Sequence, residues 1–233
     1  MKAPVLLKRK GFVPWKLCDV EEVTEQLSRN KGHERERERI LRLLVERPVR
    51  YLPVASRRHV DALHSLRVDF PNFGDVIEGL IGRLQLQVRL GDQPLRLPTM
   101  LMLGAPGLGK TAFSVRLATV LGFSLEVRSL AELSAGFILT GNDRSWSESK
   151  PGLISSFLAQ LKEDEAPLLL LDELDKGRSE SHFSPDQVLL GMLEAHTAKR
   201  WRDEHLDLCL DISPMSFAFT ANRRERVRPE LLS

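Results

Sequence analysis

The sequence predicts an α/β fold, in which a parallel sheet with helices on both faces follows a small α-helical N-terminal region. From Thr99 onward, short apolar runs alternate with amphipathic helical patterns. Parallel strands covered by helices on both faces read as continuous apolar runs, so this alternation predicts a buried parallel sheet. Two of the runs are followed by glycine-rich or acidic residues. In open α/β sheets, ligands bind at the carboxyl ends of the strands, which is where these residues would lie. The runs are Met100–Leu103, Phe123–Val127, Leu168–Leu171 and Met215–Phe219.

Composition excludes several classes of protein. Charged residues make up 28% and the hydrophobic set 42% of 233 residues, which argues against a largely disordered, collagen-like or membrane-embedded chain. No run of about 18 apolar residues occurs, so we expect no membrane-spanning helix and no membrane partner. The formal net charge of +2 gives no general tendency to bind nucleic acid, which we therefore regard as a disfavoured partner.

The number of cysteines and the pattern of the N-terminus predict the cellular compartment of the protein. Cys18 and Cys209 are far apart and too few for a disulfide framework, which favours reducing surroundings. The basic N-terminus contains only Val5-Leu6-Leu7 as an apolar stretch, whereas a signal peptide needs about 7–15 apolar residues. We therefore expect a cytoplasmic location.

The pattern of residues 1–68 predicts a helical N-terminal or neck region. Asp19 and Glu22 have the spacing of a capping box at the start of a first helix. A second helix contains the alternating charges of Glu34–Arg39, which we interpret as a solvated face, with a charged contact to another subunit as the alternative. A third helix is expected over residues 55–67.

Residues 69–233 are expected to form the α/β subdomain. Asp75 is a candidate cap for its first helix, and Gly91–Pro94 reads as a turn. The helix pattern that begins at Ala112 ends at Gly122, a typical C-terminal stop.

A phosphate-binding loop follows the first apolar run. The motif G-x-x-x-x-G-K-[ST] occurs between an apolar strand and a helix, which is the context that this loop requires. Glycines let backbone N–H groups approach phosphates, and the helix N-terminus adds positive potential. The lysine is expected to reach the β- and γ-phosphates, and the threonine hydroxyl to bind Mg²⁺. We expect ATP to contact Gly104, Ala105, Pro106, Gly107, Leu108, Gly109, Lys110, Thr111 and Ala112.

Two acids end the most apolar run. Asp172 and Glu173 directly follow Leu168–Leu171, so their carboxylates are expected at the carboxyl edge of the sheet. We expect Asp172 to hold Mg²⁺ together with Thr111, and Glu173 to act as the general base for the attacking water.

An amide ends a third strand. Asn222 follows Phe217–Ala221, and at a strand tip beside the phosphate loop it can hydrogen-bond the γ-phosphate or the attacking water. The alternative is an ordinary turn residue. With the other two motifs present, we favour a role in catalysis beside Lys110 and Glu173.

These three motifs, in this order, resemble the AAA+ ATPases over about residues 70–233. Within that family the details are most similar to the ATPase module of Lon-type proteases. The segments that carry this resemblance are Leu171–Lys176, Trp201–Asp207 and Phe217–Asn222. The resemblance implies an AAA+ core of phosphate-loop type, Mg²⁺-dependent ATP hydrolysis, a ring that is commonly a hexamer, and remodelling or unfolding of a polypeptide substrate.

The resemblance also places a pore loop around Trp146. The family's loop usually has Tyr or Phe followed by an aliphatic residue, whereas Ser147 and Glu148 follow here. A substrate-gripping Trp and an ordinary loop Trp therefore both remain open.

The family's peptidase domain, arginine finger and helical lid have no counterpart up to Ser233. An arginine finger contributes about 10³–10⁵ in rate, so this departure implies slow hydrolysis by these residues alone. The alternatives to a motor are a regulatory ATP-binding module with little hydrolysis and, less favoured, a nucleic-acid motor or loader using Arg223–Arg228. We interpret those arginines mainly as a solvated helix or loop. The histidine spacing gives no zinc site.

Overall fold

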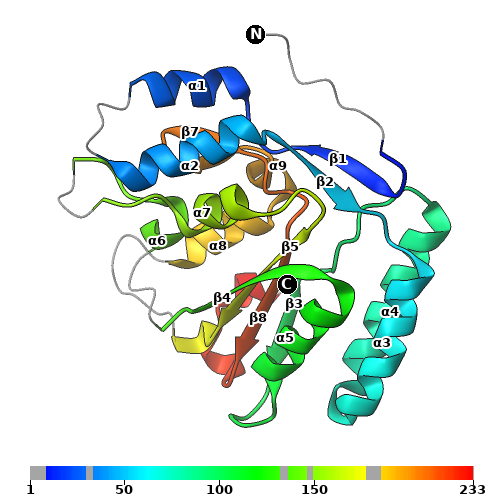
Figure 1. Cartoon of the computed structure of the whole chain (residues 1–233). Helices are drawn as coiled ribbons and strands as arrows, with labels where there is room; N and C mark the ends of the chain where they lie inside the picture. The colour runs from blue at the N-terminus through cyan, green and yellow to red at the C-terminus, as the bar shows by residue number, and fades with distance from the viewer. Residues whose placement is uncertain (1–8, 30–33, 132–135, 146–148, 177–184, 233) are drawn as a thin grey trace.

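The computed structural model describes residues 9–29, 34–131, 136–145, 149–176 and 185–232. Its elements surround a four-stranded parallel sheet, which confirms the predicted α/β class (Figure 1). None of the helices in these ranges has the length and apolar character needed to span a membrane. The strands, in spatial order, are β3 (Met100–Leu103), β8 (Ser216–Ala221), β5 (Ala166–Asp172) and β4 (Phe123–Ser129).

The sheet order explains where the helices lie. The chain crosses from β3 to β4 at the opposite edge and then returns through β5 to β8. Because parallel crossovers are right-handed, this reversal puts the first connecting helix on one face and the later ones on the other. The first is α5 (Lys110–Leu121), and the later ones are α7 (Leu153–Gln160) and α8 (Pro185–Leu193).

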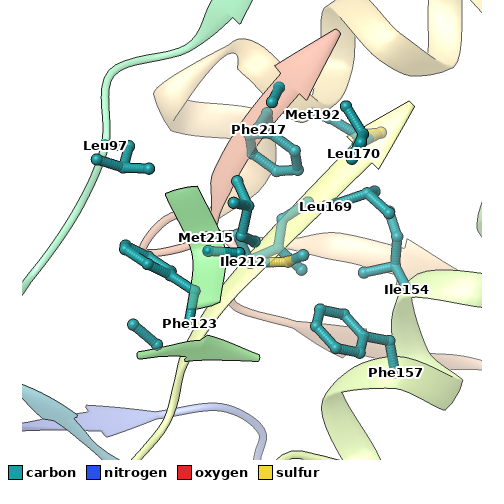
Figure 2. Packing of buried hydrophobic residues seen from close by; sticks show 14 of the residues in the cluster. Leu97, Phe123, Ile154, Phe157, Leu169, Leu170, Met192, Ile212, Met215 and Phe217 are labelled. Carbon is teal, nitrogen blue, oxygen red and sulfur yellow. The ribbon is translucent and has the colours of Figure 1, made fainter. Parts of the chain in front are cut away.

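The central strands are apolar because helices cover them on both sides. Every residue of β8, and every residue of β5 before Asp172, is buried. Figure 2 shows Ile154 and Phe157 of α7 on the side of the sheet where Leu169 of β5 lies. Such packing stabilises the sheet by roughly 1.5–3 kcal/mol for each large apolar side chain. The core thereby fixes the polar residues at the ends of β5 and β8.

Two further helices extend the layer on the α5 side of the sheet. The helix α3 (Arg57–Asp69) packs against both α5 and α4 (Gly74–Leu90). A 3₁₀ turn, Pro71–Phe73, runs directly into α4, so Phe73 occupies the cap position. Asp75 lies inside the first turn of α4 and is not its cap, which corrects the expectation from sequence.

The N-terminal segment contains the three expected helices and also two strands. Asp19 caps α1 (Val20–Ser28) by accepting a hydrogen bond from the backbone N–H of Glu21. The second helix is α2 (Arg35–Glu46). The strands β1 (Phe12–Lys16) and β2 (Val49–Pro53), which precede α1 and follow α2 in the chain, pair antiparallel. The segment is therefore not purely helical. The division of the chain at residue 68 stays a prediction.

A small hairpin lies under the N-terminal helices. Its strands are β6 (Trp201–Asp203) and β7 (Leu208–Leu210), and α1 contacts β7. The helix α2 packs on α7. The shorter elements are α6 (Phe137–Thr140), α9 (Ala195–Ala198) and the 3₁₀ turns Leu174–Lys176, Arg224–Arg226 and Pro229–Leu231.

Candidate active site

The phosphate loop connects β3 to α5, as the motif predicts. Gly107 and Gly109 both have φ of +83°, a left-handed conformation that residues with a Cβ adopt at a cost. Residues 105–108 are exposed, whereas Lys110 begins α5 and is buried. The loop therefore presents its backbone at the N-terminus of a twelve-residue helix, a favourable place for an anion.

Lys110 is held at the centre of this loop. Its Nζ donates to the carbonyl oxygens of Gly104 at 2.6 Å and Ala105 at 3.0 Å, and to Oδ1 of Asn222 at 2.9 Å. The structure thus brings together the lysine and the amide that the sequence assigned to one site. The three acceptors are uncharged, so a phosphate oxygen offers this ammonium group a stronger partner.

Asp172 joins the ends of β5 and β8 to the loop. Its Oδ2 accepts from Oγ1 of Thr111 at 2.7 Å, and its Oδ1 accepts from the backbone N–H of Glu173 at 3.0 Å. The hydroxyl of Thr220 on β8 also donates to Oδ1. The two predicted magnesium ligands are therefore adjacent. Sequence reasoning missed Thr220, although its place two residues before Asn222 was a usable signal.

Glu173 has a strained backbone and a tethered side chain. Its φ is +62°, which costs a non-glycine residue of the order of 1–3 kcal/mol. Its Oε2 accepts from Oγ of Ser129 at 3.1 Å, and its Oε1 forms an ion pair with Lys176. The carboxylate is about 30% exposed. Strained residues of this kind concentrate at functional sites, so the positive φ of Glu173 supports its choice as a candidate functional residue.

Asp175 positions Asn222. The Asp175 side chain is 4% exposed, and its Oδ1 accepts from the backbone N–H of Asn222 at 3.0 Å. Asn222 is thereby fixed from both ends, since its amide oxygen faces Lys110. Sequence reasoning gave Asp175 no role, because an acid three residues after a strand end is common in surface turns.

A largely apolar cavity of about 390 Å³ adjoins the loop on the α4 side. Phe73 stacks on Phe113 with ring centroids 4.3 Å apart, and Nδ2 of Asn72 donates to the carbonyl of Leu108 at 3.1 Å. Sequence reasoning gave Asn72 and Phe73 no role in the site. The lining residues are Asn72, Phe73, Val76, Met100, Leu101, Met102, Leu103, Leu108 and Lys110.

Two further groups named in the sequence analysis concern the pore loop and metal binding. Trp146, the candidate pore-loop residue, lies outside the described residues. In the part of the chain that the structure describes, there is no group of three or more His, Cys, Asp or Glu side chains placed to hold a metal ion.

Comparison with known proteins places these motifs in a family. Residues 100–233 match the model of the "ATPase family associated with various cellular activities (AAA)". The chain is 34% identical over 134 residues to the Lon protease of Borrelia duttonii, a match that covers 58% of this chain and 16% of that protein. It is 31% identical over 195 residues to the peroxisomal Lon protease homolog 2 of Oryza sativa subsp. indica, covering 82% and 22%.

A third relative extends the match further along the chain. The Lon protease of Leptospira interrogans is 29% identical over 219 residues, which are 91% of this chain and 26% of that protein. The chain therefore spans about a quarter or less of the length of these three relatives. Among solved structures, a point mutant of RuvB from Thermotoga maritima aligns with 18% identity and a TM-score of 0.38, over 58% of this chain and 35% of that one.

Proposed function

The chain belongs to the AAA family of ATPases, and from this premise we propose that it binds ATP at the phosphate loop and hydrolyses it with Mg²⁺. One observation carries the proposal. The Nζ of Lys110 lies 2.9 Å from Asn222 Oδ1, while Thr111 lies 2.7 Å from Asp172, so three separate motifs meet around one loop. Phosphoryl transfer is catalysed mainly by such positioning and by charge stabilisation.

The residues present fit a magnesium ion. A hydroxyl and a carboxylate are hard oxygen donors, and Mg²⁺ usually takes only one or two of them from the protein, with water and substrate phosphate as the rest. Thr111 and Asp172 would hold the ion. When bound, it would neutralise charge on the phosphate oxygens.

The nucleotide is expected to lie across the loop. We place its base in the cavity lined by Phe73 and Val76, because this cavity is lined in part by Lys110 and is mostly apolar, as small-molecule sites usually are. Its phosphates would replace the carbonyls of Gly104 and Ala105 as partners of Lys110. In this arrangement Asn222 stays beside the ammonium group and faces the terminal phosphate.

For hydrolysis, Glu173 must act on water. Its carboxylate is bound by Lys176 and Ser129, and we propose that it exchanges one of these contacts for the attacking water. It would accept the proton of that water as the oxygen attacks the γ-phosphorus and the bond to the β–γ bridging oxygen breaks. ADP and phosphate are the products.

The same tether favours a second candidate function. A glutamate whose carboxylate stays bound to Lys176 and Ser129 is not placed to orient the attacking water, so the chain would act as an ATP-binding regulatory module with little hydrolysis. Assembly into a ring and action on a polypeptide are further proposals, supported by similarity to proteins named Lon protease.

Steady-state phosphate release from Mg²⁺·ATP by wild type and Glu173→Gln tests the choice. If Glu173 is the general base, the variant should retain ATP and lose about 10²–10⁴-fold in rate. Glu126→Gln is a matched control, because Glu126 also forms an ion pair, with Arg128 at 2.6 Å, but is not part of the site. Equal rates in wild type and Glu173→Gln would contradict the base assignment, whereas ATP binding without turnover in wild type would favour the regulatory module.

A further inference from the structure

A second cavity, of about 410 Å³, adjoins the phosphate loop on the side of Asn222. It shares Ala105 and Asn222 with the surroundings of Lys110, because both of these residues accept hydrogen bonds from the lysine Nζ. This cavity therefore lies next to the place where we expect the terminal phosphate of a bound nucleotide. Its lining residues are Ala105, Pro106, Asp175, Lys176, Asn222, Arg223 and Arg226.

The turn after β8 directs two arginines to this cavity. Arg224–Arg226 form a 3₁₀ turn, and the backbone N–H of Arg226 donates to the carbonyl of Arg223 at 3.2 Å. Arg223 is extended and directly precedes this turn. Arg223 and Arg226 line one cavity, whereas Arg224 lines a different one with Leu103 and Leu231.

The cavity has an excess of positive charge. Asp175 is the one acid among the described lining residues, and its carboxylate already accepts a hydrogen bond from the backbone N–H of Asn222. Lys176 is engaged by Glu173. Arg223 and Arg226 have no hydrogen bond or ion pair from their side chains to any residue that the structure describes. Two such guanidinium groups on one wall are suited to an anion, since each can donate to phosphate oxygens as a planar fork.

We propose that Arg223 and Arg226 bind the γ-phosphate of a nucleoside triphosphate and so make the site select ATP over ADP. This inference rests on the proposed function, because it requires a nucleotide at the phosphate loop. The two arginines follow Asn222 in the chain, so the γ-phosphate receives cations from the same subunit. Asp175 holds this segment in place through the Asn222 backbone.

The test compares affinities for the triphosphate and the diphosphate. The probes are ADP and the non-hydrolysable ATP analogue AMP-PNP, both with Mg²⁺, in competition with a fluorescent ADP. Arg223→Gln/Arg226→Gln should bind AMP-PNP about 10-fold more weakly and leave ADP affinity unchanged. Arg223→Lys/Arg226→Lys should recover part of the loss, because lysine keeps the charge without the fork.

Arg224→Gln is the matched control, since Arg224 belongs to the same exposed turn but lines the other cavity. It should leave both affinities at the wild-type value. The inference is overturned if the double glutamine variant keeps the wild-type ratio of affinities, or if Arg224→Gln lowers that ratio equally. Failure of the wild-type chain to bind either nucleotide would instead overturn the proposed function itself.

Discussion

Lys110 and Arg37, in two different regions of the molecule, are both buried cations, and they are buried in different ways. At the phosphate loop, Lys110 is 8% exposed and lines a cavity. Between α2 and the β6–β7 hairpin, Arg37 is fully buried. It donates to Gln26 and to the carbonyls of His205 and Leu206, in four hydrogen bonds of 2.9–3.3 Å.

The difference lies in whether the partners can be exchanged. The partners of Lys110 are uncharged groups beside open space, and a phosphate can replace them. Arg37 joins three separate segments that are enclosed by protein, so its bonds hold those segments together. Burial of a charge alone thus does not identify a site. A buried charge beside a cavity, with weaker partners than its natural ligand, does so more reliably.

The largest expected effect is on the free energy of unfolding, and it tests whether Arg37 has a structural role. Arg37→Met should lower the free energy of unfolding by about 3–5 kcal/mol, because it leaves several buried acceptors without a donor. Urea unfolding measures this change. Arg39→Met is the control, since Arg39 is half exposed, and it should stay within about 0.5 kcal/mol of wild type. If Arg37→Met unfolds like wild type, the Arg37 contacts are not structural.

A smaller effect is expected on catalysis at Asn222. Asn222→Ala should lower kcat for ATP hydrolysis by about 10²-fold, with little change in stability, because a donor to the terminal phosphate or to the attacking water is lost. Asn222→Asp keeps an acceptor for Lys110 but loses the amide N–H. Steady-state phosphate release from both variants distinguishes the roles, since wild-type activity in Asn222→Asp would show that Asn222 only holds Lys110.

The smallest expected effect is on the pH dependence of stability, through His205, whose carbonyl accepts a hydrogen bond from Arg37. Burial lowers the pKa of His205 below its ordinary value of 6.5, and Arg37 and Arg144 act in the same direction, against Glu34. The folded state then binds fewer protons than the unfolded state at pH below 6.5. His205 therefore stabilises the fold fully above pH 6.5, and this contribution is lost as the pH falls through the folded pKa, at up to about 1.4 kcal/mol per pH unit.

Urea unfolding between pH 5 and pH 8 measures this dependence. His205→Gln should flatten the fall in stability on the acid side. Some slope should persist, because burial also lowers the pKa of His59, whose Nδ1 accepts from the backbone N–H of Ser56. An identical profile in wild type and His205→Gln would contradict the assignment.

Much of the fold could be predicted from sequence because its central strands are continuously apolar. The run Leu168–Leu171 predicts a buried strand, and the structure has β5 there. The two antiparallel pairs escaped prediction. Their strands have three to five residues, and β1 and β2 contain Pro14 and Pro53, which read as breaks. The β1–β2 pair joins segments that are far apart in the chain, and the β6–β7 strands, although close in the chain, are too short to show a periodicity.

The site shows the same division. Lys110, Thr111 and Asp172 could be predicted because their chemistry requires a fixed local pattern, and the structure brings them together. Thr220 and Asp175 act only through neighbours that folding supplies. The arginines after Asn222 were interpreted as solvated. They are exposed, but Arg223 and Arg226 also line a cavity beside the loop. The conformation of the turn after β8 determines which arginines line it, and the sequence pattern does not show that conformation.

The central claim is that the loop around Lys110 binds ATP. The most direct test is a calorimetric titration of Mg²⁺·ATP into the wild-type chain and into Lys110→Ala, with urea unfolding of both. We predict one ATP per wild-type chain, affinity lowered by about 100-fold or more in Lys110→Ala, and similar unfolding curves. Equal affinity in the two proteins, or no binding by the folded wild-type chain, would contradict the claim.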